Sequence, residues 1–390
     1  MKTIRDLADQ LGGKKVLMRV DFNVPMDKQT GEITNDLRIR KALPTIEFAR
    51  EHEARVILMS HLGRPDGQRV EELSLRGVAE RLGELLGEEV EFAPDCVGAD
   101  AEAAVSGLDD GDVLMLENTR FHAEEEENDP EFSRQLAALA DIYVNDAFGT
   151  AHRAHASTAG VADHLPAAAG FLIEKEIDYL SRATQNPDHP YVAVMGGAKV
   201  SDKINVIQNL LDKVDAMLIG GAMAYTFLKQ QGISVGNSLV EEDRLDVAAR
   251  LLEQGGDKIV LPVDHVCGRQ MEPGTEARTI DEAEIPDGWI GLDIGPRTAV
   301  QFAEAIEGAA LVTWNGPVGY FEIDRFAEGT RVVAQAMVDS DATTIVGGGE
   351  TAEAVEKLGL ADQMSHVSTG GGACLEFLSG EKLAGIAVLE

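Results

Sequence analysis

Basic side chains stand directly after several apolar segments in the first half of the chain. Arg guanidinium groups match carboxylate and phosphate oxygens with two hydrogen bonds each, so such side chains are suited to an anion. Five of them fall in or beside the segments after the expected strands, namely Arg38, His61, Arg64, Arg120 and Arg153. Pairing with surface acids would explain any one of them. Five at the same edge of one sheet indicate a small anionic ligand.

Glycine-rich loops take the same places in the second half, at 195–203, 220–224, 315–319 and 347–351. Glycine lets backbone N–H groups approach a phosphate, and a helix N-terminus adds partial positive charge. Lys199 and Lys203 in the first loop add point charges suited to phosphate oxygens. A single glycine pair is more often a turn than a site. Four such loops at successive strand ends predict a nucleotide site.

Short apolar segments alternating with amphipathic ones position these groups. Strands are expected in the first half at 16–20, 56–59, 113–116 and 142–144, and in the second at 191–195, 216–219, 258–261, 310–314 and 344–346. Helices are expected at 36–52, 74–86 and 171–180, where apolar residues recur every three or four positions. Continuous apolar strands between helices predict parallel sheets covered on both faces, with ligands at the carboxyl ends of the strands.

The length of 390 residues favours two domains over one core. The segment 186–190, which holds two prolines, breaks the helix expected before it. We therefore predict an α/β protein of two doubly wound, Rossmann-like domains joined by a hinge helix. Residues 1–170 form the N-terminal domain, 171–190 the hinge helix and linker, and 191–378 the C-terminal nucleotide-binding domain.

Acidic residues outnumber basic ones, 68 to 34, which gives a net charge of −34. Such a chain is repelled by nucleic acid and by anionic membranes. A halophile's solvated acidic surface explains the charge better than disorder, since 44% of the residues are hydrophobic. The run 124–127, four glutamates, is interpreted as solvated surface rather than a metal site. Three widely spaced cysteines, no signal peptide and no apolar membrane span favour the cytoplasm.

Several motifs are missing from the sequence. It has no G-x-x-x-x-G-K-[ST] and no H-R-D with D-F-G, so neither a P-loop enzyme nor a protein kinase is expected. No G-x-G-x-x-G opens the first βαβ unit, which argues against a nicotinamide dehydrogenase, although that alternative stays open. The histidines do not have zinc-site spacing, so anion binding or packing is the better interpretation of them, namely His61, His122, His152 and His155.

Five motifs together resemble the phosphoglycerate kinase family over essentially the whole chain. They are RVDFNVP at 19–25, SHLGRP at 60–65, GGAKVSDKI at 196–204, WNGPVGYFE at 314–322 and STGGGA at 368–373. The resemblance implies a glycolytic phosphotransferase with a carboxyl group as acceptor. Such an enzyme moves a phosphoryl group reversibly between 1,3-bisphosphoglycerate and ADP, giving 3-phosphoglycerate and ATP, with Mg²⁺. The acidic composition adds the expectation of a halophilic archaeal type.

The resemblance also implies roles for individual residues. The 3-phosphoglycerate site would comprise Asp21, Asn23, Arg38, His61, Arg64, Arg120 and Arg153. The nucleotide site would comprise Gly197, Ala198, Lys199, Lys203, Gly220, Gly221, Leu292, Asn315, Pro317, Glu322, Gly347, Gly348, Gly349, Glu350 and Thr351. The transferring group would be stabilised by Arg38, Lys199, Gly348 and Gly371.

The chain departs from the family pattern at two of these places. Glu350 stands where an aspartate usually contacts magnesium, so the metal would be held through water or from a shifted backbone. Tyr320 replaces a small aliphatic residue, which would bear on nucleotide preference. A binding protein that kept the fold but lost activity is therefore a second alternative. The resemblance further implies that 379–390 packs back onto the N-terminal domain, that closure bends the hinge, and that the protein is a monomer.

Overall fold

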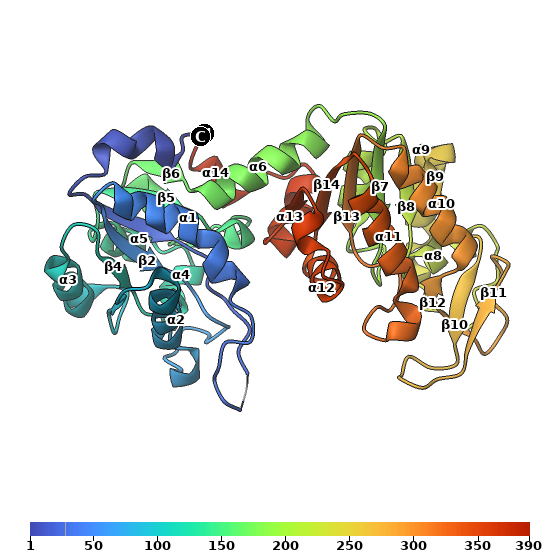
Figure 1. Ribbon diagram of the computed structural model, residues 1–390, viewed down its shortest axis with the longest axis horizontal. Coiled ribbons are helices and arrows are strands. Elements are labelled where there is room, and N and C mark those ends of the chain that lie inside the picture. Colours follow the sequence, from blue (N-terminus) through green and yellow to red (C-terminus); the bar gives the residue numbers. More distant parts are fainter. Residues whose placement is uncertain (28) are drawn as a thin grey trace. The chain divides into compact units, whose positions relative to one another are not determined.

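The computed structural model describes residues 1–27 and 29–390 and divides into two compact units. The first unit comprises Met1–Ile177 with Lys382–Glu390, and the second comprises Asp178–Glu381. Helix α6 (Phe171–Thr184) runs across the boundary between them. Figure 1 shows each sheet flanked by helices of its own unit. The domain limits at 170, 190 and 378 stay a prediction.

The first unit contains a six-stranded, all-parallel sheet in the order β3-β4-β2-β1-β5-β6. Its strands are β1 (Lys15–Arg19), β2 (Arg55–Met59), β3 (Glu91–Phe92), β4 (Val113–Met115), β5 (Ile142–Asn145) and β6 (Ala167–Ala169). Its helices are α1 (Leu37–Glu51), α2 (Arg76–Leu86), α3 (Gly98–Gly107), α4 (Ala123–Glu126), α5 (Pro130–Ala137) and α14 (Ala384–Ala387). The central strand is buried on both faces, as parallel sheets require.

Local sequence sets where these helices begin. Asp129 precedes α5, and its carboxylate accepts a hydrogen bond from Phe132 N at 2.8 Å. Pro130 occupies the first helical position, where its missing N–H costs nothing.

Helix α14 is held on the first unit because Gly385 donates its N–H to Ala151 O (2.7 Å) and its carbonyl accepts a hydrogen bond from Asn145 Nδ2 (3.1 Å).

The second unit contains another six-stranded parallel sheet, in the order β15-β14-β13-β7-β8-β9. Its strands are β7 (Tyr191–Met195), β8 (Ala216–Ile219), β9 (Ile259–Val260), β13 (Leu311–Asn315), β14 (Thr343–Gly347) and β15 (His366–Val367). Its helices are α7 (Ile204–Leu211), α8 (Met223–Gln230), α9 (Leu245–Gly255), α10 (Pro296–Glu307), α11 (Glu328–Asp339), α12 (Gly349–Lys357) and α13 (Gly371–Leu378). The prediction of an α/β fold with parallel sheets is confirmed.

A three-stranded antiparallel sheet in the second unit was not predicted. It consists of β10 (His265–Gly268), β11 (Ala277–Ile280) and β12 (Ile290–Ile294), with β10 in the middle. Figure 1 shows β10 and β11 at the edge of that unit, beyond α8 and α10. All three cysteines are buried, and none forms a disulfide bond within the described part of the chain. Among the described residues, no helix is both long enough and apolar enough to cross a membrane.

Candidate active site

The first unit gathers cationic side chains around the carboxyl end of β1. The last residue of this strand, Arg19, pairs in register with Met59 of β2 and Asn145 of β5. Its guanidinium is 1% exposed and donates to Ser157 Oγ (2.8 Å) and to His61 Nδ1 (3.1 Å). Arg19 was not among the predicted site residues, because a charged residue at the end of an apolar strand shows no site of its own in the sequence.

The loops after β1 and β2 are tied together by predicted site residues. Arg38, in the first turn of α1, donates from Nη1 to Asp21 Oδ2 at 2.8 Å. Asn23 Oδ1 accepts a hydrogen bond from Gly63 N at 2.9 Å. Asp21 is nearly buried, whereas Arg38 keeps about a third of its side chain exposed. Arg38 is thus oriented by a carboxylate and still accessible to a ligand.

Arg120 carries buried hydrogen-bond donors that the protein does not use. It lies in the turn Thr119–Phe121, and its Nη1 donates to Gly63 O at 3.0 Å. Its Nε lies 3.1 Å from Glu126 Oε1 but lacks hydrogen-bond geometry. Its Nη2 is buried without a partner among the described residues. Buried donors are almost always paired, so an unpaired guanidinium nitrogen indicates a place for an anion.

Burial and the charges of these arginines lower the pKa values of three histidines. Burial and the charges of Arg19, Arg120, Arg38 and Arg153 hold the pKa of His61 well below its usual value. Burial, with Arg120, Arg153 and Arg19, lowers the pKa of His155 to about 4. Burial and Arg153 likewise lower the pKa of His152. The four arginines that act on these histidines come from the end of β1, the first turn of α1 and the segments after β4 and β5.

Arg153 and its neighbours complete this cluster. Arg153 Nε donates to His152 Nε2 at 3.2 Å, and His152 Nδ1 is buried without a partner in the described part of the chain. Arg64, the remaining predicted arginine, is exposed. Neither His152 nor His155 was a predicted site residue, although both follow β5 in the sequence.

The interpretation of 124–127 as solvated surface is wrong at one position. Glu125 is fully buried, and its carboxylate accepts hydrogen bonds from Ser157 N (2.9 Å) and Ser157 Oγ (2.5 Å). Glu126 pairs with Arg120. A run of identical acids gives no periodic signal that would mark one member as buried.

In the second unit, glycine loops approach one another backbone to backbone. A Cβ added to Gly196 would lie 2.2 Å from Pro317 O, and one added to Gly316 would lie 2.2 Å from Gly196 O. Gly221, with φ of +65°, has Gly197 N 2.6 Å from the place of its Cβ. Only glycine permits this contact between the loops after β7, β8 and β13. The side of Gly197 facing away is open, with no atom within 4 Å of its Cβ position.

Polar side chains surround these loops. Lys203 is nearly buried, its Nζ donates to Asn315 Oδ1, and burial lowers its pKa. Asn315 Nδ2 is buried without a partner among the described residues. Thr351 Oγ1 accepts a hydrogen bond from Gly316 N at 2.7 Å. Lys199 and Ala198 are exposed beside this group.

Two helix N-termini lie next to the glycine loops. Helix α12 begins after Gly347 and Gly348, and α13 begins at Gly371. A Cβ on Gly371 would lie 3.3 Å from Gly349 N. Neighbouring helix N-termini place unpaired N–H groups and partial positive charge at one spot, which suits phosphate oxygens. The second unit therefore offers backbone donors and lysines where the first offers guanidinium groups.

Comparison with known proteins shows the family of this chain. The family description "Phosphoglycerate kinase" matches residues 4–381. The phosphoglycerate kinase of Thermosipho africanus is 59% identical, over 99% of this chain and 96% of the relative. The chain belongs to the phosphoglycerate kinase family. The phosphoglycerate kinase of Moorella thermoacetica is 56% identical, over 99% of this chain and 98% of its own. The solved Coxiella burnetii phosphoglycerate kinase is 44% identical, with a TM-score of 0.87 over 97% of this chain and 96% of that chain.

The predicted phosphoglycerate kinase function, a phosphotransfer with a carboxyl group as acceptor, is confirmed by this membership. As a family, phosphoglycerate kinases imply ATP or ADP with Mg²⁺, and 3-phosphoglycerate or 1,3-bisphosphoglycerate, as ligands. The expected halophilic archaeal type is not supported, because the relatives at this identity are bacterial.

The remaining predicted nucleotide residues of this phosphoglycerate kinase family member lie around the same loops. Leu292 on β12 is buried, and its carbonyl accepts a hydrogen bond from Tyr320 N at 2.7 Å. Pro317 is buried between the glycine loops, whereas Glu322 and Glu350 are exposed. Their ligand roles stay predictions.

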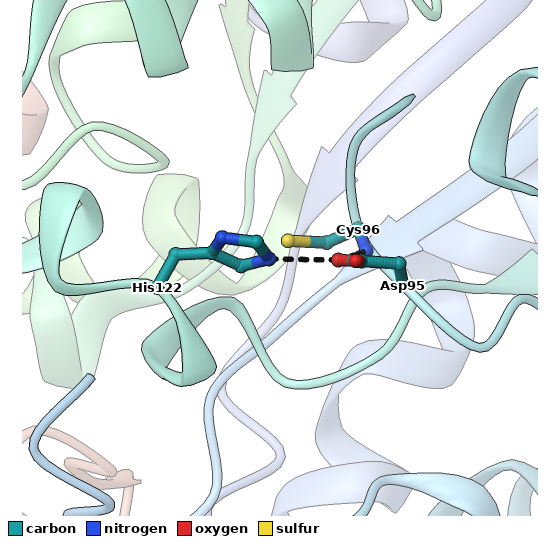
Figure 2. Close-up of side chains that lie close together, drawn as sticks. All are labelled: Asp95, Cys96 and His122. Atoms are coloured by element: carbon teal, nitrogen blue, oxygen red, sulfur yellow. Dashed lines mark hydrogen bonds and ion pairs between the residues drawn. The ribbon is translucent and has the colours of Figure 1, made fainter. Parts of the chain in front are cut away.

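A separate group of possible metal ligands lies in the first unit. Figure 2 shows the His122 imidazole facing the Asp95 carboxylate, with the Cys96 thiol beside them. Their ligand atoms lie within 4.8 Å of one another. Asp95 Oδ1 is 2.7 Å from His122 Nε2 and also accepts from Cys96 N at 2.7 Å. The hydrogen bond that His122 donates to Asp95 raises the pKa of His122. An ion pair beside a buried thiol accounts for this geometry.

Proposed function

We propose that the cationic cluster of the first unit binds 3-phosphoglycerate and 1,3-bisphosphoglycerate. The observation that carries this proposal is the buried, unpaired Nη2 of Arg120 within a group of four mutually repelling arginines. Guanidinium groups held together without enough carboxylates cost free energy, which a carboxylate or phosphate ligand would recover. The residues proposed to contact it are Asp21, Asn23, Arg38, His61, Arg64, Arg120 and Arg153.

The glycine loops of the second unit are proposed to bind ADP and ATP. Open backbone at Gly197, the two adjoining helix N-termini and the exposed Lys199 support phosphate binding there. The buried Asn315 Nδ2 supplies one further donor. The proposed nucleotide residues are Gly197, Ala198, Lys199, Lys203, Gly220, Gly221, Leu292, Asn315, Pro317, Glu322, Gly347, Gly348, Gly349, Glu350 and Thr351.

Magnesium would accompany the nucleotide and be held by Glu350. This carboxylate is exposed in the first turn of α12, and its charge reaches Lys203. One carboxylate together with phosphate oxygens is a donor set that Mg²⁺ commonly accepts. When bound, the ion would neutralise phosphate charge. Glutamate is one methylene longer than the aspartate expected here, so contact through water is part of the proposal.

Transfer is proposed to be direct and in line, without a phosphoenzyme. Phosphoryl transfer depends on positioning and charge neutralisation more than on covalent chemistry of the protein. Arg38 and Lys199 are the side chains proposed to stabilise the transferring group, with backbone donors at Gly348 and Gly371. Because the two substrates are bound by different units, we also propose closure during turnover about α6. X-ray scattering that shows no compaction with both substrates bound would contradict closure.

Three expectations extend the proposal beyond the site. A cytoplasmic location agrees with three buried cysteines that form no disulfide bond among the described residues. A monomer is the expected state, which size-exclusion chromatography with light scattering would check. A need for salt follows from the net charge of −34, because molar salt shortens the Debye length to about 3 Å and screens self-repulsion.

The deciding experiment measures ATP consumption with 3-phosphoglycerate and Mg²⁺, coupled to glyceraldehyde-phosphate dehydrogenase, at low and at molar KCl. The coupling enzyme is first shown to survive the salt. We expect magnesium-dependent turnover that is greater in molar KCl. Folded protein without turnover at either salt would refute the proposed activity of this chain, and Glu350→Asp would then test whether the longer carboxylate is the reason.

A further inference from the structure

A buried carboxylate lies behind the cationic cluster without belonging to it. Glu125, Ser157, Arg19 and His61 form a continuous chain of hydrogen bonds, and none of the four is more than 3% exposed. Burying a carboxylate is costly unless its oxygens are hydrogen-bonded. Both oxygens of Glu125 are used, and both are used by Ser157.

The direction of each hydrogen bond in this chain is fixed by chemistry. A guanidinium has only donors, so Arg19 Nε donates and Ser157 Oγ accepts, at 2.8 Å. The single hydroxyl proton of Ser157 is then free to be donated to Glu125 Oε1, at 2.5 Å. Because the Ser157 hydroxyl donates to the carboxylate, its lone pairs face Arg19. A neutral acceptor would hold the hydroxyl in this orientation less strongly, because hydrogen bonds to charged acceptors are stronger.

The chain ends at a histidine whose tautomer it determines. Arg19 Nη2 can only donate, so His61 Nδ1 accepts and the imidazole proton lies on Nε2. Burial, together with the charges of Arg19, Arg120, Arg38 and Arg153, lowers the pKa of His61 and so favours the neutral ring. A neutral ring with a proton on Nε2 is a donor suited to an anionic oxygen.

We propose that Glu125 is a positioning residue of the 3-phosphoglycerate site. Through Ser157 it orients the Arg19 guanidinium, and through Arg19 it holds His61 as the Nε2–H tautomer, without touching the substrate itself. This inference rests on the proposed function of the first unit. Glu125, the buried member of the run 124–127, was not among the predicted site residues, and the proposal gives it a role at that site.

Two substitutions interrupt the chain at different links. In Glu125→Gln only one of the two side-chain atoms is an acceptor oxygen. This oxygen can accept a hydrogen bond from Ser157 N or from Ser157 Oγ, so the other donor loses its partner. Ser157→Ala removes the bridging hydroxyl, while Tyr143 Oη still donates to the carbonyl of residue 157, at 2.9 Å. Ser133→Ala is the matched control, because Ser133 is equally buried and donates its hydroxyl to the backbone O of Asp129 at 2.9 Å.

Steady-state kinetics then separates positioning from mere folding. We expect KM for 3-phosphoglycerate to rise on the order of tenfold in both variants, with KM for ATP within about twofold of wild type. The double variant should be no worse than either single one, because both act through one chain. Ser133→Ala should leave both constants unchanged. Equal rises in both KM values, or no change in either, would overturn the proposal.

Nitrogen-15 NMR of the histidine rings gives a second readout that folding alone does not move. Wild type should show His61 as the Nε2–H tautomer, and Ser157→Ala should show a mixture. An unchanged tautomer in a folded variant would overturn the positioning role. The two proposals fail differently: wild type that binds no 3-phosphoglycerate by calorimetry would refute the site, whereas normal binding with unaffected variants would refute only the role of Glu125.

Discussion

In the first unit the strand order is β3-β4-β2-β1-β5-β6, and in the second it is β9-β8-β7-β13-β14-β15 when read from the opposite edge. In each unit the central strand, β1 or β7, pairs with the next strand on one side and with a much later strand on the other. Ligands of open parallel sheets bind at this point. The strands around β1 and β7 therefore offer the same kind of location twice, although the full strand orders differ, since β4 lies between β2 and β3 whereas β8 and β9 are neighbours.

The two units use that location differently. The first fills it with side chains, beginning with Arg19 at the end of β1 and continuing with arginines and histidines from helix α1 and from the loops after β2, β4 and β5. The second clears it of side chains, so that Gly196, Gly221 and Gly316 bring backbones together. Charged side chains should make the first site sensitive to charge and pH. Backbone packing should make the second sensitive to any added Cβ.

Removal of a cation should have the largest effect on turnover. Arg38→Ala is expected to lower kcat by about 10²–10³, as loss of a preorganised transition-state contact does. Asp21, which now accepts from Arg38, would also be left near other cations without its partner. Coupled kinetics at saturating substrates measures the change.

Arg40→Ala provides the control on the same helix. Arg40 is half exposed and bonds to Asp36 at 2.8 Å, away from Asp21. Its loss should leave kcat within about twofold, since exposed ion pairs contribute little. If Arg38→Ala kept wild-type kcat, charge stabilisation by the first unit would be the wrong explanation.

A single methyl group should damage the second site. Gly196→Ala would place Cβ 2.2 Å from Pro317 O, so the loops after β7 and β13 must separate. We expect KM for ATP to rise on the order of tenfold and stability to fall by about 3 kcal/mol, the upper end for overpacking. Both tryptophans, Trp289 and Trp314, lie in the second unit, so their fluorescence reports its unfolding.

Gly308→Ala tests whether glycine loss as such explains that result. Gly308 has φ of −86°, and the nearest atom to its Cβ position is 3.9 Å away. Alanine there should be neutral or stabilise by about 0.4–1 kcal/mol through the unfolded chain. A comparable loss in both variants would mean that the contact between loops has no special role.

The parallel strands could be predicted from the sequence better than the antiparallel ones. Continuous apolar segments such as 191–195 predicted the central strands well, because strands buried on both faces carry the strongest signal. In the antiparallel sheet, which was missed, β11 is short and partly exposed, and its two middle residues, Arg278 and Thr279, face solvent. Four residues with this exposure pattern do not distinguish a strand from a loop.

Site residues on the loops after strands were easier to predict than the buried residues that hydrogen-bond to them. Arg120 and Gly221 follow apolar strands directly, so their position in sequence implied their place at the sheet edge. Glu125 could not be predicted, because its burial depends on Ser157, 32 residues further along the chain. Arg19 was hidden for a related reason. It ends β1, and only the register shows which neighbours it meets.

A smaller effect is expected where one hydroxyl supports a glycine loop. Thr351→Val would leave Gly316 N–H without its acceptor, now 2.7 Å away, at nearly unchanged shape. An unsatisfied buried N–H costs about 1–3 kcal/mol, and we expect the lower part of that range. Tryptophan fluorescence in urea measures the loss, and Thr351→Ser should restore most of it. If Val and Ser were equally stable, backbone packing alone would hold the loop.

The smallest effect should come from pH in the first unit. Arginines and burial lower the folded pKa of His155 to about 4, below the 6.5 of the free side chain, so the unfolded chain takes up a proton first as the pH falls. Stability present above pH 6.5 is therefore lost progressively toward pH 4. His155→Gln should reduce that loss, by no more than about 1 kcal/mol once partial solvent exposure is discounted.

Hydrogen exchange across 142–163 between pH 4 and 7 measures this loss of stability, and tryptophan fluorescence from the second unit should not respond. An identical pH profile in both proteins would show that the arginines do not control this histidine, and the contrast between the units would then rest on geometry alone.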